Sequence, residues 1–225
     1  MHVALNDDVE NTAMNMIDNT LDLVPYGPVI PVIVINDVAD AVPMARALVE
    51  GGVRVLEVTL RTPVALQCMA AIAREVPEAV LGAGTIRSVA DAKAAKDVGC
   101  VFGVSPGYTS QIGLACRELG LPLLPGIATS SEVMQASADG YTFLKFFPAA
   151  QAGGIPMLKA LAGPFTDIVF CPTGGLTAET APQFLALPNV KVCGGSWLTP
   201  ADAVAAKDWA RITRLAKEAS ALRAG

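Results

Sequence analysis

Short apolar runs recur along the chain, and segments with a wider apolar spacing separate them. The runs are rich in β-branched, aliphatic and aromatic residues, which predicts buried β-strands. Their starts lie roughly 19 to 27 residues apart, about the length of one strand and one helix. The predicted strands are Val29–Ile35, Val53–Leu60, Val80–Ala83, Val101–Val104, Leu123–Ile127, Thr142–Phe146, Ile168–Cys171 and Val190–Cys193.

The separating segments place apolar residues three and four positions apart, which is typical of amphipathic helices. Residues 37–52, DVADAVPMARALVEGG, show this spacing and end at a glycine stop signal, Gly51. We also expect an extra helix over Asp7–Leu23 and a last amphipathic helix over Asp208–Leu222. The other predicted helices are Val64–Glu75, Val89–Val98, Thr109–Leu119, Ser131–Ala138, Ile155–Leu161 and Thr177–Leu187.

Eight strand-and-helix units in succession predict a (β/α)8 TIM barrel of the α/β class. We expect residues 1–225 to form a single domain, with residues 1–27 as an N-terminal helical extension. An open doubly wound sheet is the alternative. Polar residues and glycines follow nearly every predicted strand, which favours the barrel, because barrel enzymes carry their chemistry at that end of the strands.

Composition narrows the classes of partner and location. The net charge of −5 argues against a general nucleic-acid-binding protein, and it means that local positive groups must hold any anionic substrate. The apolar run Val29–Ile35 is too short to cross a membrane and contains Pro31. The five cysteines form no CxxC motif, and the first residues are acidic, unlike a signal peptide. Reduced thiols in the cytoplasm are therefore expected.

Histidine is almost absent. His2 is the single one, so the sequence excludes a Ser-His-Asp triad and a histidine-ligated metal site, and we expect no metal. Acid–base chemistry must therefore use carboxylates, lysine, tyrosine or water.

The second predicted strand ends in EVTLRTP. Side chains alternate between the faces of a strand, so Glu57 and Arg61 share one face with Val55 and Thr59. Leu56, Val58 and Leu60 occupy the other face, which should pack against the outer helices. A carboxylate and a guanidinium are thus expected inside the barrel near its open end. A structural ion pair is the alternative interpretation.

The sixth predicted strand carries a lysine in an apolar setting, FLKFF. Phe143, Lys145 and Phe147 share one face, and if that face points inward the amine stands near Glu57. Removal from water favours the neutral amine that a Schiff-base lysine needs, whereas a neighbouring carboxylate favours the ammonium form. A salt-bridged structural lysine remains the alternative.

Glycine turns follow the last two predicted strands, as PTGG and GGSW. Glycines allow backbone N–H groups to approach an anion, and a following helix N-terminus would add positive potential. Phosphate sites recur at this position in barrels. The two motifs together predict a phosphate site that includes Thr173, Gly174, Gly175, Gly194, Gly195 and Ser196.

Seven motifs together, EVTLRTP, GAGT, SPG, PGIAT, FLKFFPA, CPTGG and GGSWL, resemble those of 2-keto-3-deoxy-6-phosphogluconate aldolases. The resemblance runs from about Pro28 to the C-terminal helix. It implies a homotrimeric (β/α)8 barrel that acts as a class I, metal-independent aldolase of the Entner–Doudoroff pathway, with no cofactor. Such enzymes cleave the sugar acid phosphate to pyruvate and glyceraldehyde 3-phosphate, and many also act on 4-hydroxy-2-oxoglutarate.

The resemblance also implies a role for each matching residue. Lys145 matches the Schiff-base lysine and Glu57 the general acid–base, while Arg61 and Thr85 match the residues that bind the pyruvate carboxylate. Phe147 matches an aromatic position that influences substrate choice, and Pro106 lines the same pocket. The residues that match the phosphate and hydroxyl region are Thr173, Gly174, Gly175, Gly195 and Ser196.

Three interpretations stay open at this point. The first is the Schiff-base aldolase. The second is a phosphosugar isomerase or epimerase that uses Glu57 as its base, and the third is a non-catalytic phosphate-binding barrel. The chain departs from the family pattern at PAAQAGG, where an acidic residue is expected at Ala150 in some relatives, but this position has no assigned role. If Glu57 is not the base, water or Tyr108 is the next candidate.

Overall fold

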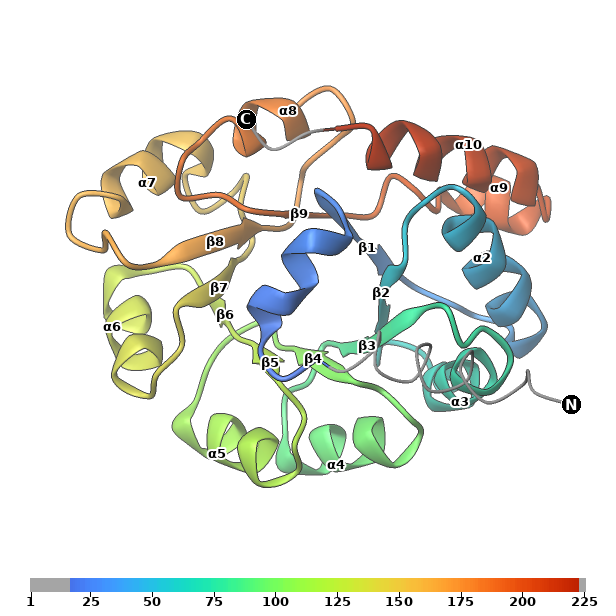
Figure 1. The fold of residues 1–225 in the computed structure, drawn as a ribbon, viewed down its shortest axis with the longest axis horizontal. Coiled ribbons are helices and arrows are strands. Elements are labelled where there is room, and N and C mark those ends of the chain that lie inside the picture. Colours follow the sequence, from blue (N-terminus) through green and yellow to red (C-terminus); the bar gives the residue numbers. More distant parts are fainter. Residues whose placement is uncertain (1–16, 223–225) are drawn as a thin grey trace, which may run out of the picture.

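The strands of this protein form two parallel sheets that curl around the centre of the molecule (Figure 1). The computed structural model describes residues 17–222. One sheet has the order β5-β4-β3-β2-β1-β9 and the other β6-β7-β8. The strands are β1 (Val29–Ile33), β2 (Val55–Thr59), β3 (Val80–Gly84), β4 (Phe102–Val104), β5 (Leu123–Leu124), β6 (Gly126–Ile127), β7 (Phe143–Phe146), β8 (Val169–Pro172) and β9 (Cys193–Gly195).

Helices cover the outside of the curled sheets (Figure 1). Several begin at a polar cap whose side chain accepts a backbone N–H, as at Asp37, Ser88 and Thr129. The helices are η1 (Thr20–Tyr26, a 3-10 helix), α2 (Val38–Glu50), α3 (Ala65–Glu75), α4 (Val89–Asp97), α5 (Ser110–Glu118), α6 (Ser130–Ala138), α7 (Gly154–Leu161), α8 (Ala181–Leu185), α9 (Ala201–Ala205) and α10 (Trp209–Ser220). The predicted α/β class with a parallel sheet is confirmed.

The alternation of side chains along the strands separates an enclosed core from two outer cores. On β2, Val55 belongs to the enclosed cluster, while Leu56 and Val58 pack in an outer cluster with the helices. On β7, Phe143 is enclosed and Leu144 packs outward. The side-chain directions predicted from period-two alternation are therefore confirmed for both strands.

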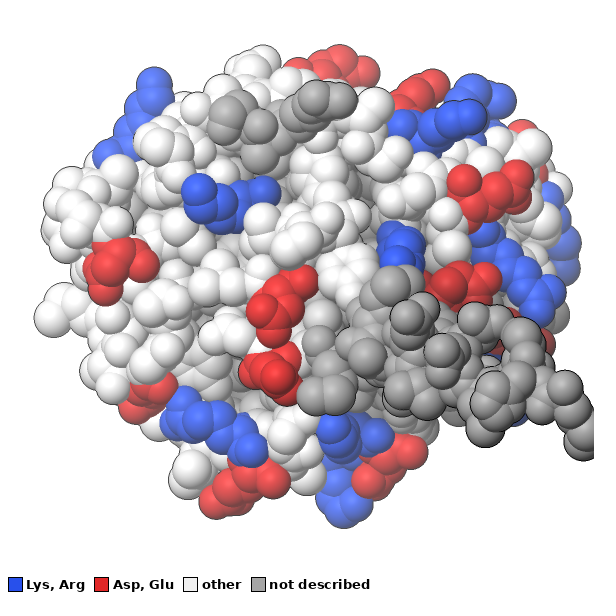
Figure 2. Space-filling view, in the orientation of Figure 1, with Lys and Arg blue, Asp and Glu red and all other residues white. Residues whose placement is uncertain are grey.

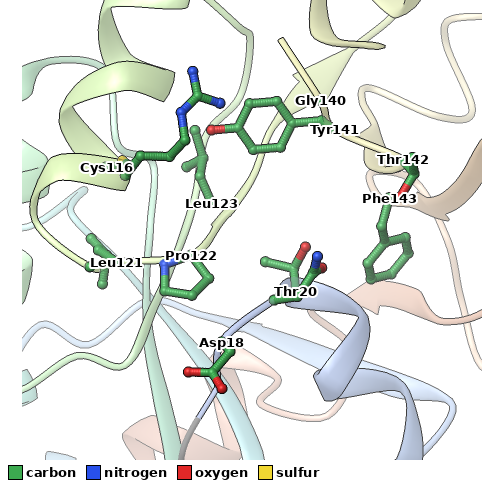
Figure 3. A pocket seen from close by; sticks show the side chains of 13 residues that line it. Asp18, Thr20, Cys116, Leu121, Pro122, Leu123, Gly140, Tyr141, Thr142 and Phe143 are labelled. Carbon is green, nitrogen blue, oxygen red and sulfur yellow. The ribbon is translucent and has the colours of Figure 1, made fainter.

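The segment η1 closes one end of the enclosed core. Leu23 is fully buried and packs with the enclosed residues of the strands, and η1, in blue, crosses the centre of the view (Figure 1). A cavity of about 280 Å³ lies between η1 and the segments that precede β5 and β7 (Figure 3). It therefore lies at the amino ends of the strands, and no predicted site residue lines it.

Several predicted elements differ from the observed ones. Leu123–Ile127 is interrupted at Pro125, which has no N–H for a strand ladder, and so becomes β5 and β6. The last strand lies at Cys193–Gly195 instead of Val190–Cys193, and helical structure within Thr177–Leu187 is limited to α8. The predicted helix Asp7–Leu23 lies mostly outside the described residues, and of its described part only residues 20–23 are helical, in the 3-10 helix η1.

Charged side chains are scattered over the face seen in Figure 2, outside the part drawn in grey. Lys and Arg side chains alternate there with Asp and Glu among wide uncharged areas, so this face lacks the continuous basic surface typical of nucleic-acid-binding proteins. Among residues 17–222, no helix has the length and apolar character to cross a membrane.

The contribution of η1 to the enclosed core can be measured as a change in the free energy of unfolding. Leu23→Ala should lower the free energy of unfolding by about 2–5 kcal/mol, because it leaves a cavity in a fully buried position. Leu21→Ala, at a position of η1 that is 37% exposed, is the matched control and should change it by about 0.5 kcal/mol or less. Urea denaturation of both variants tests this, and equal losses would contradict it.

Candidate active site

Lys145 and Glu57 meet inside the curled sheets. Lys145 lies on β7 and Glu57 on β2, and the Lys145 Nζ atom donates a hydrogen bond of 3.2 Å to Glu57 Oε1. The two residues are only 5% and 2% exposed. The ion pair joins strands of different sheets across the enclosed space, so it brings together residues that are far apart in the sequence.

Two glycines of β3 make room for buried side chains. A Cβ atom on Gly84 would lie 2.3 Å from Glu57 Oε1, the atom that accepts the bond from Lys145. A Cβ atom on Gly82 would lie 2.2 Å from the Phe102 ring in the enclosed core. The ion pair thus depends on the absence of a side chain at Gly84.

Several side chains around the Lys145 amine are apolar. The Phe147 ring centroid lies 5.3 Å from the Nζ atom, and Phe143 and Cys171 belong to the enclosed apolar cluster. Cys171 is the register partner of Lys145 on β8. Burial raises the pKa of its thiol to about 12, although the nearby Lys145 opposes the shift. Cys171 is therefore a neutral thiol at neutral pH.

A cavity of about 170 Å³ lies at the carboxyl ends of the strands. Phe147, whose ring is close to Lys145 Nζ, is part of its lining, whereas Lys145 and Glu57 are not among the lining residues. It brings together eight of the predicted site residues: Arg61, Phe147, Thr173, Gly174, Gly175, Gly194, Gly195 and Ser196. Among residues 17–222, Arg61 is the one charged residue in the lining, so it supplies the positive charge there. The lining residues are Val32, Val34, Arg61, Phe147, Thr173, Gly174, Gly175, Leu176, Gly194, Gly195 and Ser196.

Thr85 supports Arg61 from the end of β3. The Arg61 Nε atom donates to Thr85 Oγ1 at 3.4 Å. The backbone of Thr85 has a φ of +65°, which is unusual for a β-branched residue and costs about 1–3 kcal/mol. Its neighbours hold this conformation, because Leu60 donates to the Gly84 carbonyl and Ile86 donates to the Val104 carbonyl.

The glycine turns after β8 and in β9 are shaped by their neighbours. Gly174 and Gly175 have φ values of +101° and +76°, which glycine adopts without strain. A Cβ atom on Gly194 or Gly195 would overlap the side chain of Thr173 or the ring of Trp197, respectively. The predicted helix N-termini do not follow these turns directly, since α8 begins at Ala181 and α9 at Ala201.

The two remaining candidate residues, Pro106 and Tyr108, lie in different surroundings. The backbone of Pro106 lies against Gly126, whose Cβ would come within 2.4 Å of it, and Gly126 is a register partner of Lys145. Tyr108 lies elsewhere, because its hydroxyl donates to Asp139 Oδ2 at 2.8 Å and its ring packs edge-on against Tyr141. Burial and this hydrogen bond raise the pKa of Tyr108. Tyr108 is therefore not placed to act as a base in the cavity.

The family model for "KDPG and KHG aldolase" matches residues 18–215, nearly the whole described chain. The chain belongs to the KDPG and KHG aldolase family. A 2-dehydro-3-deoxy-phosphogluconate aldolase of Pseudoalteromonas atlantica is 52% identical over 204 residues, which cover 91% of this chain and 95% of that protein. The KHG/KDPG aldolase of Escherichia coli K12 is 51% identical over 193 residues, 86% and 91% of the two chains.

Solved structures of KDPG aldolases share the fold. The enzyme from Legionella pneumophila, with pyruvate captured as a covalent carbinolamine, has a TM-score of 0.87 and 44% identity, and the match covers 89% of this chain and 97% of that one. The enzyme from Zymomonas mobilis ATCC 29191 has a TM-score of 0.87 and 47% identity over 91% and 98% of the chains. These values confirm the family resemblance that the motifs indicate.

The sequence did not single out four residues that lie around this KDPG and KHG aldolase site. Val32, Val34 and Leu176 line the cavity, and Cys171 adjoins Lys145, yet each has the apolar character of an ordinary strand or core residue. Their sequence carries no distinguishing signal. Among residues 17–222, no group of three or more His, Cys, Asp or Glu is arranged to hold a metal ion.

A substitution at Gly84 tests whether the Glu57 carboxylate needs the space that this glycine leaves. Gly84→Ala should displace the Glu57 carboxylate from Lys145 and slow aldol cleavage about 100-fold, the usual effect of a displacement of about 1 Å. Gly107→Ala is the matched control, because its Cβ would meet nothing within 4 Å. Steady-state kinetics and thermal unfolding of both variants provide the measurement. Full activity in Gly84→Ala would show that the carboxylate does not need this position.

Proposed function

We propose that the protein is a class I aldolase that cleaves 2-dehydro-3-deoxy-6-phosphogluconate to pyruvate and glyceraldehyde 3-phosphate. It also cleaves 4-hydroxy-2-oxoglutarate to pyruvate and glyoxylate. The observation that carries the proposal is the buried Lys145–Glu57 hydrogen bond of 3.2 Å. Phe147 adjoins this pair and lines a cavity where Arg61 is the one charged lining residue among residues 17–222. The carbinolamine in the Legionella pneumophila relative supports the same chemistry.

Proton transfer within the ion pair prepares the nucleophile. If the Lys145 ammonium gives a proton to Glu57, the result is a neutral amine and a neutral carboxylic acid, with no change in the net charge of the buried site. The amine then attacks the C2 ketone and forms a carbinolamine. Glu57 returns the proton to the departing hydroxyl group, which leaves as water, and an iminium ion remains beside the carboxylate.

The iminium ion makes the C3–C4 bond breakable. Glu57 takes the proton of the C4 hydroxyl group through a water molecule, the C3–C4 electron pair moves into an enamine, and the aldehyde leaves. Glu57 then protonates C3, and water attacks the iminium ion to release pyruvate. This last step restores the Lys145 ammonium and the Glu57 carboxylate, so all protons balance over the cycle.

The cavity residues take the remaining roles. Arg61, held by Thr85, binds the carboxylate of the pyruvate half, and Phe147 and Pro106 shape the pocket beside it. The phosphate and distal hydroxyl groups bind at the glycine turns. The residues in that region are Thr173, Gly174, Gly175, Gly195 and Ser196.

We also propose a single-domain (β/α)8 barrel for residues 1–225, with residues 1–27 as an N-terminal extension. β5 and β6 then count as one strand interrupted by Pro125. Isolated parallel bridges from Phe170 to Val190 and from Thr173 to Gly194, between β8 and the chain of β9, support closure. Assembly as a homotrimer in the cytoplasm rests on the family resemblance, and analytical ultracentrifugation tests the trimer.

Covalent trapping tests the proposal against its alternatives. Borohydride reduction in the presence of pyruvate should add one pyruvyl group at Lys145, because only an iminium intermediate is reduced to a stable adduct. Neither an isomerase using Glu57 as its base nor a non-catalytic phosphate-binding protein forms this adduct. Peptide mass spectrometry identifies the modified residue.

The matched controls are two lysine variants. Lys145→Met should abolish both trapping and cleavage, whereas Lys159→Met, at an exposed position on α7, should retain both. An adduct on another lysine, or none in the unmodified protein, would refute the assignment.

Glu57→Gln tests proton transfer separately from substrate binding. Glutamine keeps the shape but cannot act as a base, so cleavage should slow by about 10²- to 10⁴-fold. Exchange of the pyruvate methyl protons with deuterium should slow as well, because it also needs a base at C3. NMR measures the exchange.

Pyruvate should still bind to Glu57→Gln, since Arg61 and Thr85 remain. Trapping at Lys145 should therefore persist at long incubation, which separates a loss of the base from a loss of the fold. Methyl exchange at the normal rate in this variant would mean that Glu57 is not the base.

A further inference from the structure

The turn after β7 carries a glutamine next to Gly175, one of the residues that line the cavity. Ala149 donates its backbone N–H to the Thr173 carbonyl at 2.8 Å, and Ala150 donates to the Gly174 carbonyl at 3.0 Å. Within the turn, Gly154 donates to the Ala149 carbonyl at 2.8 Å. These bonds fix the backbone on both sides of Gln151 against the PTGG turn, so the position of Gln151 relative to the cavity is set by the main chain.

The Gln151 side chain lies next to Gly175, one of the cavity-lining glycines. A Cβ atom on Gly175 would be 3.5 Å from Gln151 Nε2 and 3.7 Å from Oε1. Among residues 17–222, no group forms a hydrogen bond with this carboxamide. Its two N–H donors are therefore available to a ligand at the glycine turn.

The scarcity of charged residues in the cavity lining makes a neutral hydrogen-bond donor such as Gln151 more important. Among residues 17–222, Arg61 is the one charged residue in the lining, and the proposed function uses it for the substrate carboxylate. The described residues at the glycine turns then offer a phosphate group neutral donors. A hydrogen bond to a charged group is stronger than one between neutral groups, so each neutral donor near the turn contributes strongly to binding.

We propose that Gln151 is a specificity-determining residue that donates an N–H to the phosphate group of the substrate. The inference rests on the proposed function and adds to it a residue that favours phosphorylated over unphosphorylated 2-keto acids. Ala150, its neighbour, is uncharged, so this edge of the cavity presents no carboxylate to the phosphate. The Gln151 carboxamide takes no part in the chemistry at Lys145.

Two substitutions at one position test this inference. Gln151→Ala removes the donor and should raise KM for 2-dehydro-3-deoxy-6-phosphogluconate about 10-fold, the effect of losing a hydrogen bond to a charged group. Gln151→Glu keeps the size but places a negative charge beside the phosphate, and should raise KM further. In both variants kcat should stay within about twofold, and so should kcat/KM for 4-hydroxy-2-oxoglutarate.

Gln111→Glu is the control for net charge, because it makes the same change at an exposed position of α5 and should leave both substrates unaffected. A normal KM for the phosphorylated substrate in both Gln151 variants would overturn the inference, and so would an equal rise for both substrates. Such results leave the aldolase assignment intact if the unmodified protein cleaves both substrates. If it cleaves neither and traps no pyruvate, the proposed function fails and this inference fails with it.

Discussion

The hydrogen bond between Lys145 and Glu57 places two ionisable groups in the interior of the protein, and much of the surrounding structure accommodates it. Removing two charges from water costs several kcal/mol for each ion in proteins generally, so such a pair is weak evidence for stability. Gly84 leaves space for the Glu57 carboxylate, Gly82 leaves space for the Phe102 ring, and η1 closes the far end of the core. Phe147 lines the cavity at the carboxyl ends of the strands, and its ring centroid lies 5.3 Å from Lys145 Nζ. The cost of such a pair is consistent with the catalytic role proposed for it.

The sequence predicts this arrangement well where simple periodicity decides it. Alternation along β2 places Glu57 inward with Val55, and alternation along β7 does the same for Lys145. Because parallel strands present their carboxyl ends on one side, Arg61 and the two glycine turns also had to converge there. The seven motifs then identified the family, which the 52% identity over 204 residues confirms.

Other features depend on three-dimensional contacts that no local pattern reveals. The conformation of Thr85 follows from bonds made by residues on either side of it, and its own side chain disfavours it. The sequence around Gln151 is typical of a turn, and the backbone bonds to the PTGG turn bring its side chain next to Gly175. The helix predicted over Thr177–Leu187 is limited to α8, because Thr177 and Thr180 exchange backbone-to-side-chain hydrogen bonds in a turn that precedes it.

The packing of Trp197 against Gly195 has a spectroscopic consequence. The chain contains only two tryptophans, and the ring of this one occupies the space that a Cβ on Gly195 would need. The other, Trp209, begins α10 on the outside of the molecule. If the glycine turn binds an anion as proposed, Trp197 is the indole in contact with that turn, and a change in the intrinsic fluorescence of the unlabelled protein on titration with phosphate would report the binding.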